Sequence, residues 1–146
     1  MIQRIQSIFL VLAATSGFGV LALPFATTSE GVQASALFSD KVYSIGDNIG
    51  LLVLFVLAGA LSVAAIFLFK NRQVQMKIEK FALIADILGI VSAVVLFWQD
   101  FANIGNASVE GGLAVCLPFL FILFSSLALR AIKKDENLVR SADRLR

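Results

Sequence analysis

Long runs without a charged side chain are the feature of this sequence that most restricts its fold. Residues 5–29, 48–69 and 111–129 contain no Asp, Glu, Lys or Arg. A helix rises ~1.5 Å per residue, so about 20 apolar residues cross the ~30 Å hydrocarbon core of a bilayer. Only 15% of the residues are charged and 59% are hydrophobic, whereas soluble domains carry roughly a quarter charged residues. The sequence therefore excludes a soluble globular protein and predicts an all-α membrane protein.

The apolar runs predict a single four-span membrane domain over residues 1–146, folded as a four-transmembrane-helix bundle. The expected spans are residues 5–24, 48–69, 81–99 and 111–130, followed by a tail at 131–146. We interpret the first span as retained, because it exceeds the ~7–15 apolar residues of a signal peptide and lacks an Ala-x-Ala cleavage site. Pro118 is expected to kink the fourth span, since proline removes a backbone N–H donor.

The basic residues indicate the orientation of the spans. Of the 12 Lys and Arg residues, all but Lys41 lie before the first span, between the second and third spans, or from the end of the fourth span onward. Cytoplasmic loops keep an excess of Lys and Arg. We therefore expect both termini in the cytoplasm and two acidic loops outside. Trp98 would then lie near the outer interface, where aromatic residues gather.

The first outer loop, residues 25–47, has a pattern that predicts a small β-hairpin. Apolar residues alternate along 32–38, a polar turn follows at 39–41, and β-prone residues occupy 42–45. Alternation around a polar turn is typical of paired strands. A two-stranded hairpin is marginally stable by itself, so an irregular loop remains the alternative.

Asp86 is the only ionisable residue well inside an expected span. An acidic side chain at the bilayer centre costs about 2.5–3.5 kcal/mol on insertion scales. On a helical wheel Asp86 shares a face with Ala82, Ala85, Gly89 and Ala93, so it is expected to point into the bundle. Its role is open between a structural ion pair or hydrogen bond, a proton or ion path, and contact with a partner subunit. The candidate intramembrane polar site comprises Asp86, Ser125, Ser126, Arg4 and Arg130.

The tail is predicted to be a cytoplasmic C-terminal helical extension. It contains neither Pro nor Gly, and Glu136 and Arg140 have the spacing of an i,i+4 ion pair. Leu138, Ala142 and Leu145 form an apolar line, with which the segment could lie on the membrane surface, pack on the middle loop or dock on another protein. Acidic residues interrupt the basic ones and no aromatic residues interleave with them, so nucleic-acid binding is not expected. Anionic lipid headgroups or a partner are expected to contact Lys133, Lys134, Arg140, Arg144 and Arg146.

The rare residue types argue against catalysis. The chain has no histidine and one cysteine, Cys116, inside an apolar run. This composition excludes histidine-based zinc sites and Ser-His-Asp triads. The sequence also lacks phosphate-loop and nucleophile-elbow motifs. We therefore expect a protein that is not an enzyme and has no catalytic, cofactor-binding or metal-binding residues.

Three segments carry a resemblance to a known family: the opening MIQRIQSIFLVLAA, the middle FLFKNRQVQMKIEKFALI and above all the closing RAIKKDENLVRSADRLR. Over essentially its whole length the chain resembles a Bacteroidota family of small four-pass integral membrane proteins, catalogued as a domain of unknown function (DUF family 4293). The resemblance implies a four-helix protein of the bacterial inner membrane. It implies no activity, ligand or catalytic residue.

The residues favour a non-catalytic function. Few ionisable groups lie inside the spans, whereas small residues that permit close helix packing are frequent. The leading hypothesis is an accessory or scaffold subunit of an inner-membrane assembly. Its expected partners are the lipid bilayer, anionic lipid headgroups, and other membrane protein subunits or copies of itself. The alternative is a small oligomeric transporter or channel with Asp86 in its path.

Overall fold

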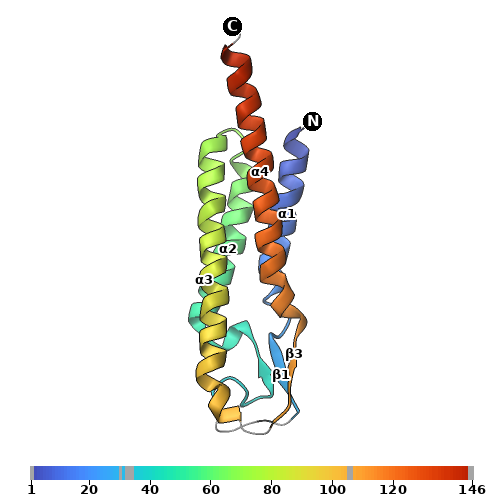
Figure 1. Cartoon of the computed structure of the whole chain (residues 1–146), viewed down its shortest axis with the longest axis vertical. Coiled ribbons are helices and arrows are strands. Elements are labelled where there is room, and N and C mark those ends of the chain that lie inside the picture. The colour runs from blue at the N-terminus through green and yellow to red at the C-terminus, as the bar shows by residue number, and fades with distance from the viewer. Residues whose placement is uncertain (1, 30, 32–34, 105–106, 145–146) are drawn as a thin grey trace.

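The computed structural model describes residues 2–29, 31, 35–104 and 107–144, without the side chains of residues 2–4, 140 and 142–144. This described part contains four α-helices: α1 (Ile2–Gly19), α2 (Ile49–Phe67), α3 (Arg72–Ile104) and α4 (Cys116–Arg144). It also contains three short strands, β1 (Ala26–Thr28), β2 (Val42–Tyr43) and β3 (Val109–Gly111), and two 3₁₀ turns, η1 (Ile45–Asp47) and η2 (Leu113–Val115). The strands lie at one end of the helical bundle, and α1 begins and α4 ends at the other (Figure 1).

The four helices form a closed ring, because each packs against its neighbours in the chain and α4 also packs against α1. Three of the described helical segments are long and apolar enough to cross a membrane: Ile49–Phe67, Arg72–Ile104 and Leu113–Val139. The apolar part of α1, Ile5–Gly19, is shorter. These lengths and compositions are those of a membrane protein. The fold is mostly helical, as expected, and its β-structure is a three-stranded sheet rather than the two-stranded hairpin predicted for the first loop.

The first helix is shorter than the expected span 5–24. α1 ends at Gly19, and a turn follows in which Leu21 N donates to Phe18 O at 3.0 Å. Glycine is a poor helix former, and the residue before Pro24 is biased away from helical geometry. These two residue types explain why the apolar run continues after the helix has ended.

The third helix is longer than the expected span 81–99. It begins at Arg72, where Asn71 Oδ1 accepts a hydrogen bond from Val74 N at 3.3 Å. Good helix formers follow without Gly or Pro until residue 89. The expected loop at 70–80 is therefore mostly helical, and a short turn joins α2 to α3.

The fourth helix confirms the predicted extension but not the predicted kink. α4 begins at Cys116, which places Pro118 in its first turn. A proline there removes an N–H that has no helical acceptor, so it does not disturb the helix. α4 then continues as one helix to Arg144.

The strands form one antiparallel sheet in the order β2-β1-β3. Ala26 pairs with Tyr43 on one side and with Gly111 on the other. An antiparallel pair within the loop 25–47 is thus confirmed, but its first strand is β1 rather than the alternating run at 32–38. Of that run, residues 32–34 lie outside the described residues, and residues 35–38 do not form a strand. β1 gains a partner on both edges, which a lone hairpin would not provide.

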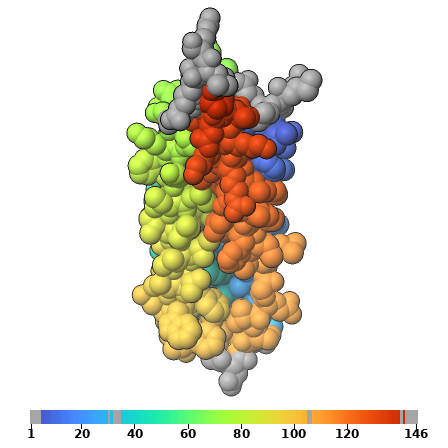
Figure 2. Space-filling model, turned by 45° about the horizontal axis from the view of Figure 1, so that its top comes forward, coloured from blue at the N-terminus to red at the C-terminus, as the bar shows by residue number. Residues whose placement is uncertain are grey.

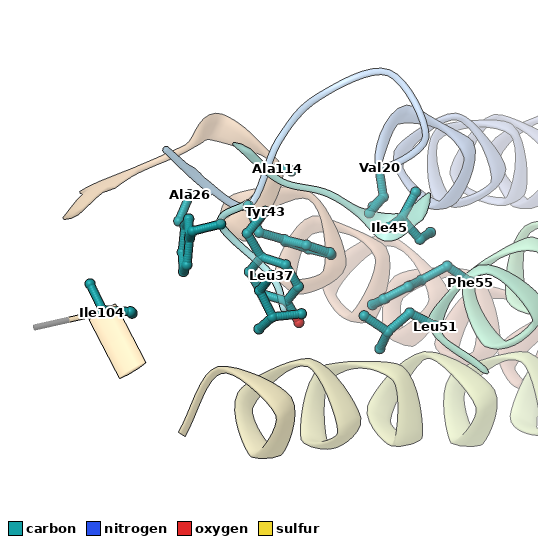
Figure 3. Packing of buried hydrophobic residues seen from close by; sticks show 11 residues of the cluster. Val20, Ala26, Leu37, Tyr43, Ile45, Leu51, Phe55, Ile104 and Ala114 are labelled. Atoms are coloured by element: carbon teal, nitrogen blue, oxygen red, sulfur yellow. The ribbon is translucent and has the colours of Figure 1, made fainter. Parts of the chain in front are cut away.

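An aromatic and aliphatic core lies between the sheet and the adjacent helix ends (Figure 3). The ring of Tyr43 lies 5.4 Å from Phe25, 6.0 Å from Phe38 and 6.5 Å from Phe97, measured between centroids. Aromatic pairs at such distances contribute beyond the area that they bury. This core joins the first loop to α3 and covers one end of the bundle.

Asp100, near the end of α3, fastens the first loop to the helices. Its carboxylate accepts hydrogen bonds from Leu37 N at 3.0 Å, from Ser35 Oγ, and from Asn103 Nδ2 at 2.8 Å. Hydrogen bonds to a carboxylate are stronger than those between neutral groups. The segment before β2 is therefore held over the end of α3.

Small residues set the spacing of the helices in the middle of the bundle. Ala13 of α1, Ala58 of α2, and Ala82 and Ala85 of α3 are buried around Phe121 of α4. Small side chains let helix backbones approach closely where the hydrophobic effect is weak. The packing role expected for the small residues of α3 is confirmed by this arrangement.

Candidate functional site

A row of buried polar side chains runs along the face of α3 that points into the bundle. Gln75, Glu79 and Asp86 are each at most 2% exposed. Their spacing of four and seven residues places them on one side of a helix, and they extend over ~16 Å at ~1.5 Å per residue. α3 is one of the helices able to cross a membrane. The row is therefore shielded by the other helices from both water and lipid.

Glu79 is held by α2 and faces α4. Ser62 Oγ on α2 donates to both carboxylate oxygens, at 3.2 Å from Oε1 and 3.1 Å from Oε2. The buried hydroxyl of Ser125 on α4 approaches the same carboxylate, but makes no hydrogen bond with a described residue. In the described part of the chain, no Lys or Arg forms an ion pair with Glu79. A buried carboxylate with a single hydroxyl donor is weakly compensated for its loss of hydration.

Asp86 is more isolated than Glu79. Its side chain is completely buried, and neither of its oxygens has a hydrogen-bond partner among the described residues. It points inward, as the helical wheel predicts, on the face that also buries Ala82, Ala85 and Gly89. An uncompensated buried charge is costly. This carboxyl group is therefore suited to bind a proton or a cation, whereas its complete burial keeps it from contact with a partner subunit.

The remaining candidates of the intramembrane polar site are dispersed. Ser125 is buried near Glu79, Ser126 is half-buried, and Arg130 is exposed. Arg4 lies in α1, but its side chain is outside the described residues. The bundle thus brings Asp86 and Ser125 into its interior, whereas Arg130 does not turn inward. Among the described residues, no group of three or more Cys, Asp or Glu could hold a metal ion.

Glu79 and Gln75 are functional candidates that the sequence reasoning missed. The expected third span starts at residue 81, which leaves both residues in a loop. The signal that could have found them is the spacing 75, 79, 82 and 86, which continues one helical face. Asn71 is a favourable residue to precede a helix. A predicted third helix that began directly after Asn71, and not at the first apolar residue, would have included Gln75 and Glu79.

Polar contacts between α3 and α4 close the end of the bundle that lies away from the sheet. Arg72 Nη2 lies 2.9 Å from Asp135 Oδ2 in an ion pair. One residue further along each helix, Gln73 Nε2 donates to Glu136 Oε1 at 3.5 Å. These two contacts fix α4 relative to the start of α3 where it leaves the bundle.

Beyond these contacts α4 protrudes past the other helices (Figure 1). Lys133 and Lys134 are exposed on it, and so are the apolar side chains of Leu138 and Val139. The structure therefore presents an exposed helical tail with basic and apolar groups. The other expected contact residues lie outside the described residues, either in their side chains alone (Arg140, Arg144) or entirely (Arg146).

Comparison with known proteins gives one match. A family model described as Domain of unknown function (DUF4293) matches residues 2–145. The match covers all four helices and the three strands. No curated protein and no solved structure matches the chain.

Proposed function

Because the chain belongs to the family described as Domain of unknown function (DUF4293), we propose its function from its own residues: a non-catalytic accessory or scaffold subunit of a membrane protein assembly. In this proposal all four helices span the bacterial inner membrane, with both termini in the cytoplasm. The ~27 Å length of the 18-residue α1 is close to the ~30 Å that a span requires. The partners are other membrane protein subunits or further copies of this chain.

The distribution of positive charge supports this orientation. α1 begins, α2 ends and α4 ends at the same end of the bundle (Figure 1). The start of α1, residues 70–80 and the chain from Arg130 onward together contain 11 of the 12 basic residues. The other basic residue, Lys41, precedes β2 at the opposite end. An excess of Lys and Arg is typical of the cytoplasmic side. The sheet would then lie on the outer face of the membrane.

The observation that carries the scaffold proposal is the continuity of α4. One helix leads from the apolar bundle into the exposed tail, with Ile132 fully buried and Leu138 48% exposed. The Arg72–Asp135 ion pair fixes the direction of the tail. A helix held in this way loses little conformational entropy when a partner binds to it. Leu138 and Val139 offer the apolar contact, and Lys133 and Lys134 offer attraction to anionic headgroups.

The experiment compares two substitutions on neighbouring exposed residues of the tail. Leu138→Asp and Asn137→Asp add the same charge to the same helix, but only the first removes an apolar contact. We expect proteins that co-purify with the wild-type chain in mild detergent to be lost with Leu138→Asp and kept with Asn137→Asp. An identical set of partners for both variants, and for a chain lacking residues 137–146, would reject the tail as a docking surface.

The buried carboxyl groups favour a second candidate, a small oligomeric transporter or channel. Proton and ion paths through membranes use carboxylates inside the bundle, and Glu79 and Asp86 are both completely buried. The test is proton or cation flux into vesicles that contain the purified chain. If this candidate is correct, the wild-type chain gives a measurable flux, and Asp86→Asn and Glu79→Gln reduce that flux without changing assembly. The absence of any flux would exclude it.

A further inference from the structure

An apolar cavity opens between α3 and α4 at the sheet end of the bundle. Its volume is about 310 Å³. At its floor Phe55 and Tyr43 are 0% and 3% exposed, whereas Val94 and Phe119 at its rim are each 59% exposed. In Figure 2 blue and teal atoms, the colours of the segments from β1 to the start of α2, are visible between the yellow of α3 and the orange of α4. The cavity therefore leads from the outer surface of the bundle into its interior.

The chemistry of the cavity is that of a hydrocarbon site. Its lining residues are apolar apart from Tyr43, and the hydroxyl of Tyr43 donates to Ala93 O at 3.0 Å. No side-chain donor in the described lining is thus left for a polar ligand. Cavities lined in this way stay dry and bind apolar molecules, as an engineered cavity of ~150 Å³ binds benzene. A dry void of this size leaves the surrounding rings without contact partners, so an apolar occupant would stabilise them.

The size of the cavity selects the kind of occupant. A helix is about 10–12 Å in diameter with its side chains, so it cannot enter a space of about 310 Å³. The volume is about twice that of the benzene-binding cavity, which suits a stretch of one hydrocarbon chain and no headgroup. α3 and α4 carry the rim and are both long and apolar enough to cross a membrane. In the proposed membrane placement, the rim of the cavity therefore faces the hydrocarbon core of the bilayer.

We propose that this cavity binds one acyl chain of a membrane lipid, drawn from the leaflet on the side of the sheet. The proposal rests on the membrane placement given above and does not depend on the scaffold role. The chain enters between Val94 and Phe119 and ends against Phe55. A lipid held in this way differs from the lipids that surround the bundle, because its acyl chain reaches the buried residues Phe55 and Tyr43.

The test uses a phospholipid with a photoreactive diazirine in its acyl chain, incorporated into vesicles with the full-length chain. After illumination, mass spectrometry locates the labelled residues. We expect label on Phe55 and Tyr43 in addition to lipid-facing residues. Ala93→Phe fills the cavity and should abolish the floor label. Val91→Phe adds the same ring on an exposed position of α3 outside the cavity and should keep the floor label.

A second variant keeps the test valid if Ala93→Phe does not fold. Val94→Trp enlarges an exposed rim residue, needs no interior space, and should reduce the floor label several-fold. Label on lipid-facing residues such as Val91 but none on Phe55 or Tyr43 in the wild type would overturn the proposal. So would floor label that persists in both Ala93→Phe and Val94→Trp. If Val91 is also unlabelled, the membrane placement itself is wrong.

Discussion

Replacing Gly112 with alanine should destabilise the sheet end, because the backbone of another segment occupies the space for a side chain. A Cβ atom at Gly112 would lie 2.1 Å from Pro24 O and 2.9 Å from Pro24 C. Both are backbone atoms that cannot move independently, and Gly112 N donates to Phe25 O at 2.8 Å. Relieving the overlap moves the two segments apart and weakens this bond. Overpacking costs about 1–3 kcal/mol and a backbone hydrogen bond about 0.5–1.5 kcal/mol, so we expect a loss of roughly 2–4 kcal/mol.

The adjacent residue supplies the matched control. A Cβ atom at Gly111 would have nothing within 4 Å. Alanine there reduces the freedom of the unfolded chain, which stabilises a compatible site by about 0.4–1 kcal/mol. The two substitutions therefore differ in sign although they add the same methyl group one residue apart.

The assay is thermal unfolding of both variants in the same detergent, followed by the fluorescence of Trp98, the single tryptophan. At roughly 2–4 °C per kcal/mol for a chain of this size, Gly112→Ala should lower the midpoint by about 4–16 °C. Gly111→Ala should leave it unchanged or raise it slightly. Equal midpoints for the two variants would refute the argument from backbone contact.

Three further predictions concern the polar groups. Ser62→Ala removes the hydroxyl donor of Glu79 and should cost about 1–3 kcal/mol of unfolding free energy; an unchanged denaturation midpoint would show that the bond contributes nothing. Asp100→Ala leaves the donors of the first loop unpaired and should cost at least about 2 kcal/mol, whereas Glu110→Ala on the exposed face of β3 should stay within about 0.5 kcal/mol. Burial raises the pKa of Tyr43 to about 12. The folded chain therefore holds this proton more tightly than the unfolded chain, in which tyrosine titrates near ~10. Stability is kept below pH ~10 and falls as the pH rises towards about 12. Ultraviolet absorbance of the single tyrosine measures the titration, and a native midpoint near that of the unfolded chain would contradict it.

The helical part of the fold could be predicted because apolar length is a local property. The runs at 48–69 and 111–129 are visible without any tertiary information, and α2 and α4 occupy them. The start of α3 could not be predicted in the same way, because polar residues fill its first turns. The burial of these polar residues depends on neighbours from α2 and α4, which the sequence does not identify. Glu79 precedes the apolar run and was therefore missed, whereas Asp86 lies inside the run and was found.

The sheet was only partly predictable for a related reason. β2 has a β-prone sequence of its own, so its position was expected. β1 has the sequence Ala-Thr-Thr and acquires its strand geometry from partners on both sides. β3 comes from the segment between α3 and α4, and no local pattern indicates which distant segment a strand will pair with.

The position of β1 between β2 and β3 also has a consequence for biosynthesis. Ala26 and Gly111 are paired although they are 85 residues apart in the sequence. During translation the first loop must wait, with one edge of its central strand open, until the third helix and the segment after it have emerged from the ribosome. Completion of the sheet therefore requires that the segments before α4 have been made and positioned, and a nascent chain arrested before residue 109 would leave an unpaired strand edge available to quality-control proteases.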